Sequence, residues 1–132
     1  LKKAKEGIYP LKHARTSTVN YQKSGGTKAF SEYYQSKYDS VIMNRELKKN
    51  ITFANHNLVT DSVFGEMHLV VCRNVLIYFD RVLQDRVFNL FNDSLITGGF
   101  LCMGSKESLQ FSEVYEHFEE TANKEKIYRK IK

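Results

Sequence analysis

A short apolar run, MHLVVC at residues 67–72, constrains the fold of this chain more than any other feature. Its β-branched valines and short length are typical of a strand that is covered on both faces, as in a parallel sheet. The run stops at Arg73 and Asn74, and apolar sequence resumes as VLIYF before Asp80. Because a plain core strand would not carry a guanidinium beside an amide, the run predicts a buried strand with polar side chains at its end.

The elements around this strand predict an α/β chain. FDRVLQDRVFNLFNDSLITGG carries apolar residues at helical spacing and predicts a helix that Asp80 caps and Gly98-Gly99 ends. GFLCMG predicts another buried strand, and VYEHFEETANKEKIYRKIK predicts two strands joined by a turn at residues 122–124. Upstream, ITFANHNL predicts a strand that ends near His56 and Asn57. The predicted sheet is therefore mostly parallel and ends in an antiparallel hairpin.

The N-terminal part of the chain gives weaker signals. LKKAKEGIY predicts a helix that ends at Gly7, with Pro10 shortly after it. Residues 13–28 show no sustained period and predict a surface connection. FSEYYQSKYDSVIMN places its aromatic residues equally well on one face of a helix or in a hairpin that turns at SKYDS. Both alternatives stay open.

Size and composition narrow the class of protein. A chain of 132 residues with 42% hydrophobic content can bury an ordinary core, so residues 1–132 are expected to form a single domain. Its apolar runs are too short for a membrane span, and LKKAKEGIYP lacks the apolar middle of a secretion signal. We therefore expect a cytoplasmic protein without membrane insertion.

Charge and cysteine usage exclude two further kinds of site. The net charge of +5 comes from scattered basic residues, which argues against a nucleic-acid partner. Cys72 and Cys102 lie in apolar runs without CxxC spacing, so we expect two buried, reduced thiols. The histidines show no metal-ligand spacing either, and no metal site is expected.

The polar ends of two predicted strands indicate a binding crevice. In open parallel sheets, ligands bind beyond the carboxyl ends of the strands. Arg73 and Asn74 follow one predicted strand and Asn57 ends the preceding one, so their side chains are expected to face the same crevice. Alternatively, Arg73 and Asn74 only turn the chain and satisfy exposed backbone groups. Spacing alone does not separate these alternatives.

The block VVCRNVLIYFDRVLQDRVFNLFNDSLITGGFLCMGSKESL resembles the C-terminal half of the chemotaxis-receptor methyltransferases of the CheR type. The shared features are CRN-hydrophobic-IYF-[DN], a helix, a Gly-Gly strand and a G-x-x-E-x-L turn. AKEGIYPL, NITFANHNLV and KIYRKI extend the resemblance over essentially all of the chain. It implies the C-terminal part of a Rossmann-like sheet in a bacterial signalling enzyme that depends on S-adenosylmethionine.

The resemblance also implies a reaction and a site. The parent enzyme would be an O-methyltransferase that forms glutamate methyl esters on the cytoplasmic region of chemotaxis receptors and releases S-adenosylhomocysteine. Cofactor contacts would come from Asn57, Leu58, Arg73 and Asn74, and catalytic contacts from Arg73 and Tyr78. An ionised glutamate needs no general base, so such a site must mainly align the reactants. Alternatively, Tyr78 is simply the aromatic residue at the start of the next helix.

Departures from the family pattern keep a rival open. The family's glycine-rich loop, acidic ribose partner and N-terminal helical domain precede the point where this chain starts, so we interpret the chain as a truncated domain. His68 stands where the family's F-D-hydrophobic strand usually has Asp. Thr97 stands where Pro is common before Gly-Gly. The rival is a non-catalytic signalling or peptide-binding module that kept the fold. An exposed sheet edge in a truncated domain also predicts a homodimer.

One interval is expected to contact the receptor. Residues 21–43 correspond to a small antiparallel subdomain with which some family members bind the receptor's tail as an added edge strand. The tyrosines of this interval would then form side-chain pockets. The alternative is a mobile linker whose tyrosines pack on the sheet.

Overall fold

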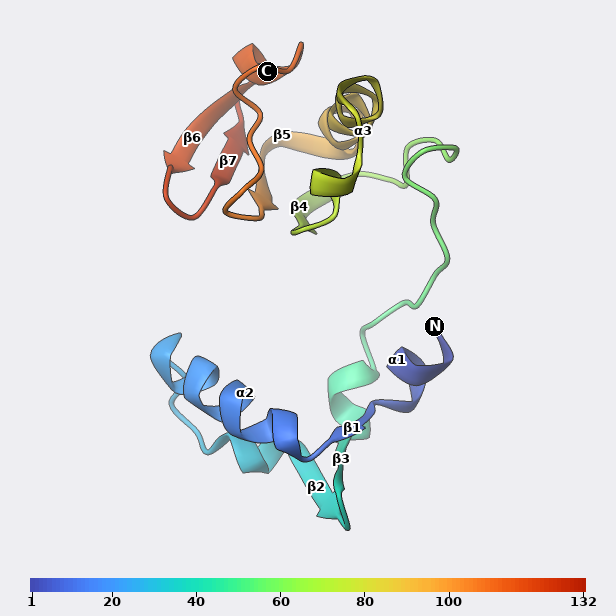
Figure 1. Cartoon of the computed structure of the whole chain (residues 1–132), viewed down its shortest axis with the longest axis vertical. Coiled ribbons are helices and arrows are strands. Elements are labelled where there is room, and N and C mark those ends of the chain that lie inside the picture. The colour runs from blue at the N-terminus through green and yellow to red at the C-terminus, as the bar shows by residue number, and fades with distance from the viewer. The chain divides into compact units, whose positions relative to one another are not determined.

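The computed structural model describes all residues from 1 to 132, and they form two compact units, Leu1–Asn55 and His56–Lys132. Figure 1 shows the helices and strands of each unit. We call them the N-terminal unit and the C-terminal unit and describe each by itself. The expectation of one domain over residues 1–132 stays a prediction.

Two helices flank the first strand of the N-terminal unit. Helix α1 (Lys2–Glu6) ends at Gly7, whose φ of 68° is left-handed, as the sequence predicts. Strand β1 (Ile8–Pro10) leads into helix α2 (Lys12–Lys23). The surface connection expected over residues 13–28 is therefore wrong for most of its length. Only Ala14 of α2 is buried, so this helix has no apolar stripe by which its sequence could be recognised.

The rest of the N-terminal unit is a hairpin with two short 3₁₀ turns. Strands β2 (Tyr34–Lys37) and β3 (Ser40–Met43) pair antiparallel, and β1 pairs with the other edge of β3. This confirms the hairpin alternative for FSEYYQSKYDSVIMN and excludes the helix. The 3₁₀ turns are η1 (Phe30–Tyr33) and η2 (Arg45–Lys48). The result is a three-stranded antiparallel sheet in the order β1-β3-β2.

The strand expected in ITFANHNL is absent, which corrects the prediction, because residues 51–66 contain neither helix nor strand. The backbone there bonds to local side chains instead. The Asn57 side-chain Oδ1 accepts from the Val59 N–H at 2.9 Å, and the Asp61 Oδ2 accepts from the Asn57 N–H at 2.7 Å. Asparagine and aspartate commonly divert the backbone into such turns. Leu58 and Phe64 hold this segment against the core of the C-terminal unit.

Four strands form the sheet of the C-terminal unit: β4 (Met67–Cys72), β5 (Leu95–Met103), β6 (Phe118–Ala122) and β7 (Ile127–Lys130). Their order is β4-β5-β7-β6. Strands β4 and β5 are parallel, whereas β5–β7 and β6–β7 are antiparallel. The predicted terminal hairpin is confirmed. The expectation of a mostly parallel sheet is wrong for residues 1–132, because β4–β5 is the one parallel pairing of this sheet and the other two are antiparallel.

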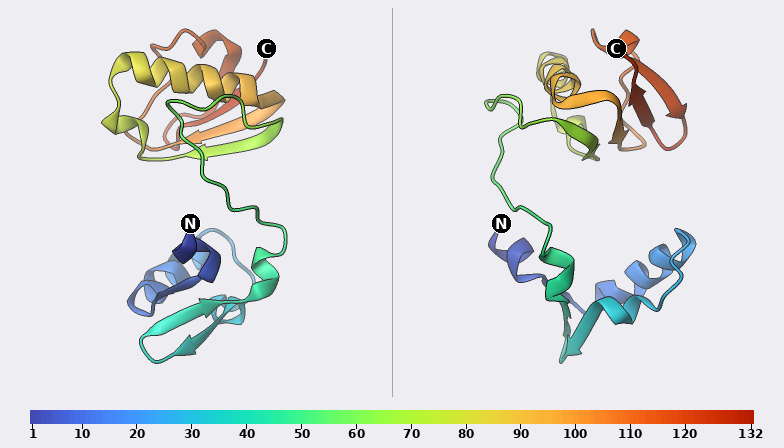
Figure 2. Two further views of the ribbon diagram at one scale, coloured as in Figure 1. Left: turned by 90° about the vertical axis from the view of Figure 1, so that its right-hand side faces the viewer. Right: turned by 180° about the vertical axis from the view of Figure 1, so that it is seen from behind.

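Helix α3 (Arg81–Ser94) covers one face of this sheet, as Figure 2 shows. Asp80 caps it as predicted, accepting from the Leu83 N–H at 2.9 Å. Gly98-Gly99 does not end the helix, because the chain enters β5 directly at Leu95. The Lys130 ammonium donates to the carbonyls of Asn92 (2.5 Å) and Leu95 (2.9 Å), where a cation suits the helix C-terminus.

The core lies between α3 and the sheet. It contains apolar side chains from β4, β5, β7 and α3, among them Val70, Val87, Phe91, Leu101, Met103 and Tyr128. Cys72 and Cys102 are both free thiols, but only Cys72 is buried as expected, and Cys102 is half-buried. None of the helices is both long and apolar enough to cross a membrane.

Candidate functional site

The loop after β4 carries the residues that the sequence singles out. Arg73 and Asn74 follow the last residue of β4, and the short 3₁₀ turn η3 (Leu76–Tyr78) comes next. Cys72 is the register partner of Met103, the last residue of β5, so both parallel strands end at the same edge. The loop therefore lies at the carboxyl end of the parallel pair, where an open sheet binds ligands.

A single buried carboxylate fixes the backbone of this loop. The Glu107 Oε1 accepts from the N–H groups of Val75 (3.0 Å) and Leu76 (2.8 Å). Its Oε2 accepts from the N–H groups of Asn74 (3.1 Å) and Gly104 (2.7 Å). Glu107 is buried, and these four charge-assisted bonds occupy both of its oxygens. They tie the loop after β4 to the loop after β5.

We call Glu107 and the four N–H groups that it binds the Glu107 clamp. The close approach of Gly104 to Glu107 and Asn74 in this clamp requires a glycine at position 104. A Cβ at Gly104 would lie 2.8 Å from the Glu107 Oε2 and 2.9 Å from the Asn74 nitrogen, and closer still to the Asn74 side chain. Any larger residue at position 104 would push the two loops apart. Asn74 itself has a φ of 58°, a conformation that asparagine tolerates better than most residues.

A glutamine supports the same loop from α3. The Gln84 Nε2 donates to the carbonyls of Leu76 (2.9 Å) and Phe79 (3.1 Å), on either side of η3. Sequence reasoning missed the roles of Glu107 and Gln84. The spacing Gly104-Ser105-Lys106-Glu107 was a signal for the first, because it places an acid one turn after a buried strand. The helical pattern of α3 gave no signal for the second.

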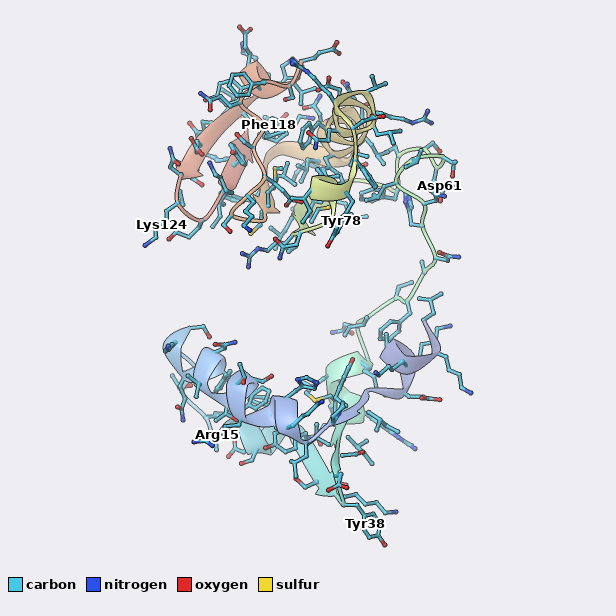
Figure 3. The ribbon with its side chains drawn as sticks, viewed as in Figure 1. Arg15, Tyr38, Asp61, Tyr78, Phe118 and Lys124 are labelled. Carbon is cyan, nitrogen blue, oxygen red and sulfur yellow. The ribbon has the colours of Figure 1, made fainter.

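With the backbone held from inside, the loop's polar side chains project into solvent. Arg73, Asn74 and Tyr78 are all exposed, and Tyr78 is 81% exposed. Figure 3 shows Tyr78 extending outward from the η3 turn. None of the three side chains has an intramolecular hydrogen bond in the structure, so the guanidinium, amide and phenol are available to a ligand. The side chains of Arg73 and Asn74 do not satisfy the loop's backbone groups, because Glu107 performs that task. Asn74 does turn the chain with its left-handed backbone, and a binding role for either side chain stays a prediction.

Asn57 and Leu58 lie on the turn before β4 rather than at a strand end. Asn57 is exposed, but its amide oxygen is already bonded to the Val59 N–H. The Asn57 N–H lowers the pKa of the Asp61 carboxyl, so this turn is stabilised by an ionised acid. Leu58 is half-buried against the core. The idea of two adjacent polar strand ends is therefore wrong, and a cofactor role for Asn57 and Leu58 stays a prediction.

The remaining titratable groups near the loop offer no nucleophile. Burial, together with the negative charge of Glu107, raises the pKa of the Cys72 thiol to about 11, so it stays protonated at neutral pH. His68 lies on β4 and is exposed. No group of three or more His, Cys, Asp or Glu side chains is arranged to hold a metal ion. The site therefore offers hydrogen-bond donors on exposed polar side chains and little else.

The chain that carries this loop is similar to a known class of protein. The family model for the CheR methyltransferase, SAM binding domain, matches residues 1–127, so the chain belongs to the CheR methyltransferase family. The chain is 49% identical to Cher3 of Pseudomonas putida over 98% of its own length and 48% of that protein's length. It is also 42% identical to the chemotaxis protein methyltransferase of Listeria innocua, over 48% of this chain and 24% of that protein. The chain thus spans about half the length of Cher3, and less of the other relatives.

Proposed function

We propose that the chain is the cofactor-facing part of an S-adenosylmethionine-dependent O-methyltransferase that forms glutamate methyl esters on the cytoplasmic region of chemotaxis receptors. One observation carries the proposal. In a chain of the CheR family, a buried carboxylate holds the loop after β4 so that Arg73, Asn74 and Tyr78 all project outward. Such an arrangement presents polar groups to a ligand at the strand ends.

The side chains of the loop fit the cofactor and substrate by their chemistry. S-adenosylmethionine, when bound, supplies a methyl group on a positively charged sulfur. The Asn74 amide can hydrogen-bond polar groups of the adenosyl or amino-acid part, and Asn57 and Leu58 would flank it. The Arg73 guanidinium can hold a substrate carboxylate with two parallel hydrogen bonds. The exposed Tyr78 can offer its ring face to the sulfonium or its hydroxyl to the carboxylate.

Arg73 and Tyr78 would act by orientation and not by proton transfer. A glutamate carboxylate is ionised at neutral pH, so one of its oxygens can form the new bond to the methyl carbon without a base. The carbon–sulfur bond breaks at the same time, and its electron pair stays on the sulfur. Alignment of this kind can contribute about 7 to 11 kcal/mol to barrier lowering. The protonated thiol of Cys72 plays no part.

The free edge of β4 supports the proposal that the sheet is the C-terminal part of a Rossmann-like sheet. Strand β4 lies at one edge of the four-stranded sheet, so the backbone N–H and C=O groups on its outer side have no strand partner. Its Leu69 and Val71, 57% and 63% exposed, alternate with the buried Val70 and Cys72 and lie on the sheet face that α3 does not cover. An apolar edge strand usually needs a partner. In the 132-residue chain we propose that a second copy pairs there. Sedimentation that stayed monomeric at all concentrations would contradict this pairing.

Residues 21–43 are proposed to bind the receptor's tail. The interval contains the edge strand β2, and its exposed backbone can pair with an extended peptide. A cavity of about 390 Å³ in the same unit has a largely aromatic and apolar lining, including Phe30, Tyr34, Val41 and Met43. Such a cavity suits an apolar side chain of the peptide.

Isothermal titration calorimetry with S-adenosylhomocysteine tests the proposed function. We would compare the 132-residue chain with a version extended upstream. Binding by the extended version, weaker or lost in the short chain, is the expected result. Absence of binding by both versions would contradict the proposal and favour the non-catalytic module.

A further inference from the structure

The Glu107 carboxylate is buried without a basic partner. It takes part in no ion pair, and its charge is balanced by four backbone N–H groups alone. Successive N–H groups of residues in left-handed and then right-handed conformations form a concavity that binds anions. Asn74 (φ 58°) and Val75 (φ −113°, ψ −49°) have this geometry. The anion in this concavity is therefore supplied by the protein itself.

This arrangement decides which atoms of the loop a ligand can use. The N–H groups of Asn74, Val75 and Leu76 point inward to Glu107, so they are not available to a carboxylate or a ribose hydroxyl. Recognition at this loop must therefore come from side chains. The directions of those side chains depend on the backbone that Glu107 holds.

We propose that Glu107 is a positioning residue of the methyl-transfer site, one that keeps the loop after β4 in its ligand-ready conformation before any ligand binds. The inference rests on the proposed function for its role in catalysis. It adds that the loop is preorganised by one carboxylate rather than ordered by the cofactor. Preorganisation of this kind avoids a reorganisation cost during the reaction.

The test compares Glu107→Gln with Phe118→Ala. Glutamine keeps the shape of glutamate, but its NH₂ group would face two N–H donors in place of an oxygen. Phe118 is buried in β6, at the opposite edge of the sheet from β4, so its truncation lowers stability without touching the loop. Should Glu107→Gln fail to fold, Glu107→Asp replaces it, because its carboxylate is one methylene too short to reach all four donors.

The first readout is amide hydrogen exchange at residues 74–76 in the 132-residue chain without ligand. We expect exchange in Glu107→Gln to be at least about 10-fold faster than in Phe118→Ala after correction for global stability. Equal rates in the two variants would show that Glu107 does not hold the loop and would overturn the proposal.

The second readout is methyl transfer by the full-length protein. We expect kcat/KM to fall about 100-fold in Glu107→Gln, the scale of a misplacement of about 1 Å, and to stay near wild type in Phe118→Ala of similar melting temperature. Equal activity in both variants would overturn the positioning role and leave the proposed function intact. A wild-type protein that transfers no methyl group would overturn both, whatever the exchange rates show.

Discussion

The two units of this chain differ in how their elements are held. In the C-terminal unit, α3 and the four-stranded sheet enclose a continuous core. In the N-terminal unit the only buried apolar side chains are those of Ala14 and Val41. Its aromatic cluster, in which neighbouring ring centroids lie 5.5–6.3 Å apart, remains partly exposed and consists of Tyr21, Phe30, Tyr33 and Tyr34.

This difference suits the two tasks that we propose. A loop that must align reacting atoms needs a rigid support, and the C-terminal unit gives it a packed core and the Glu107 clamp. A surface that receives a peptide needs exposed backbone edges and partly exposed aromatic side chains, which the N-terminal unit has.

The largest expected effect comes from core truncation. Phe91 is buried within the C-terminal core, so Phe91→Ala should lower the free energy of unfolding by about 3–5 kcal/mol. Phe30→Ala, in the partly exposed aromatic cluster, should cost clearly less. Urea denaturation followed by tyrosine fluorescence and circular dichroism measures both. Equal losses of unfolding free energy in the two variants would show that both units are packed equally well, which would contradict the contrast between them.

Gly104→Ala should cost about 1–3 kcal/mol, because its Cβ would crowd the Glu107 carboxylate and the Asn74 backbone. The adjacent Ser105→Ala is the control, since Ser105 is exposed and its change should stay within about 0.5 kcal/mol. Thermal unfolding of the two variants gives the comparison. If alanine were accepted at 104 without loss, the two loops would be less tightly joined than the structure indicates.

The helix cap offers a smaller effect. Asp80→Ala removes the acceptor for the Leu83 N–H and should cost about 1 kcal/mol, whereas Asp80→Asn keeps an oxygen there and should stay near wild type. Helix α2 has no such side-chain cap. Denaturation midpoints of the two variants measure the difference. Similar losses in both would mean that the charge, and not the hydrogen bond, matters.

The smallest expected effect is a pH dependence. Burial raises the pKa of the Cys72 thiol from 9.0 to about 11, so the folded state resists ionisation more than the unfolded state. The stability this gives is fully present below pH 9 and is lost as the pH rises towards 11, by at most about 1 kcal/mol at pH 10. Cys72→Ala should remove this part of the alkaline destabilisation. Unfolding curves at pH 8 and pH 10 for both proteins provide the test.

The same contrast explains what the sequence could predict. The C-terminal strands and α3 show clear hydrophobic patterns because each buries one face in the core, so β4, β5, the hairpin and the Asp80 cap were all predictable. The expectation that β4 is covered on both faces is wrong, because Leu69 and Val71 on its other face are exposed. Helix α2 was not, because a helix that buries only Ala14 leaves no periodic signal. The segment before β4 contains Ile51 and Phe53 at strand spacing, but its asparagines favour turns, and no neighbouring strand is present to pair with it.

The site was predictable in part. The break after MHLVVC located the loop, because polar residues directly after a buried strand need an explanation. The inward direction of the loop's N–H groups was not predictable, since it depends on a carboxylate more than thirty positions away along the chain. Spacing within one loop does not carry such long-range information.

The most direct test of the account measures glutamate methyl ester formation on a chemotaxis receptor by the full-length protein and its Arg73→Ala variant. We expect the variant to lose about 100-fold or more in turnover while its melting temperature stays unchanged, because the exposed guanidinium aligns the carboxylate and supports no packing. Undiminished methylation by Arg73→Ala, or a loss fully explained by unfolding, would contradict the account.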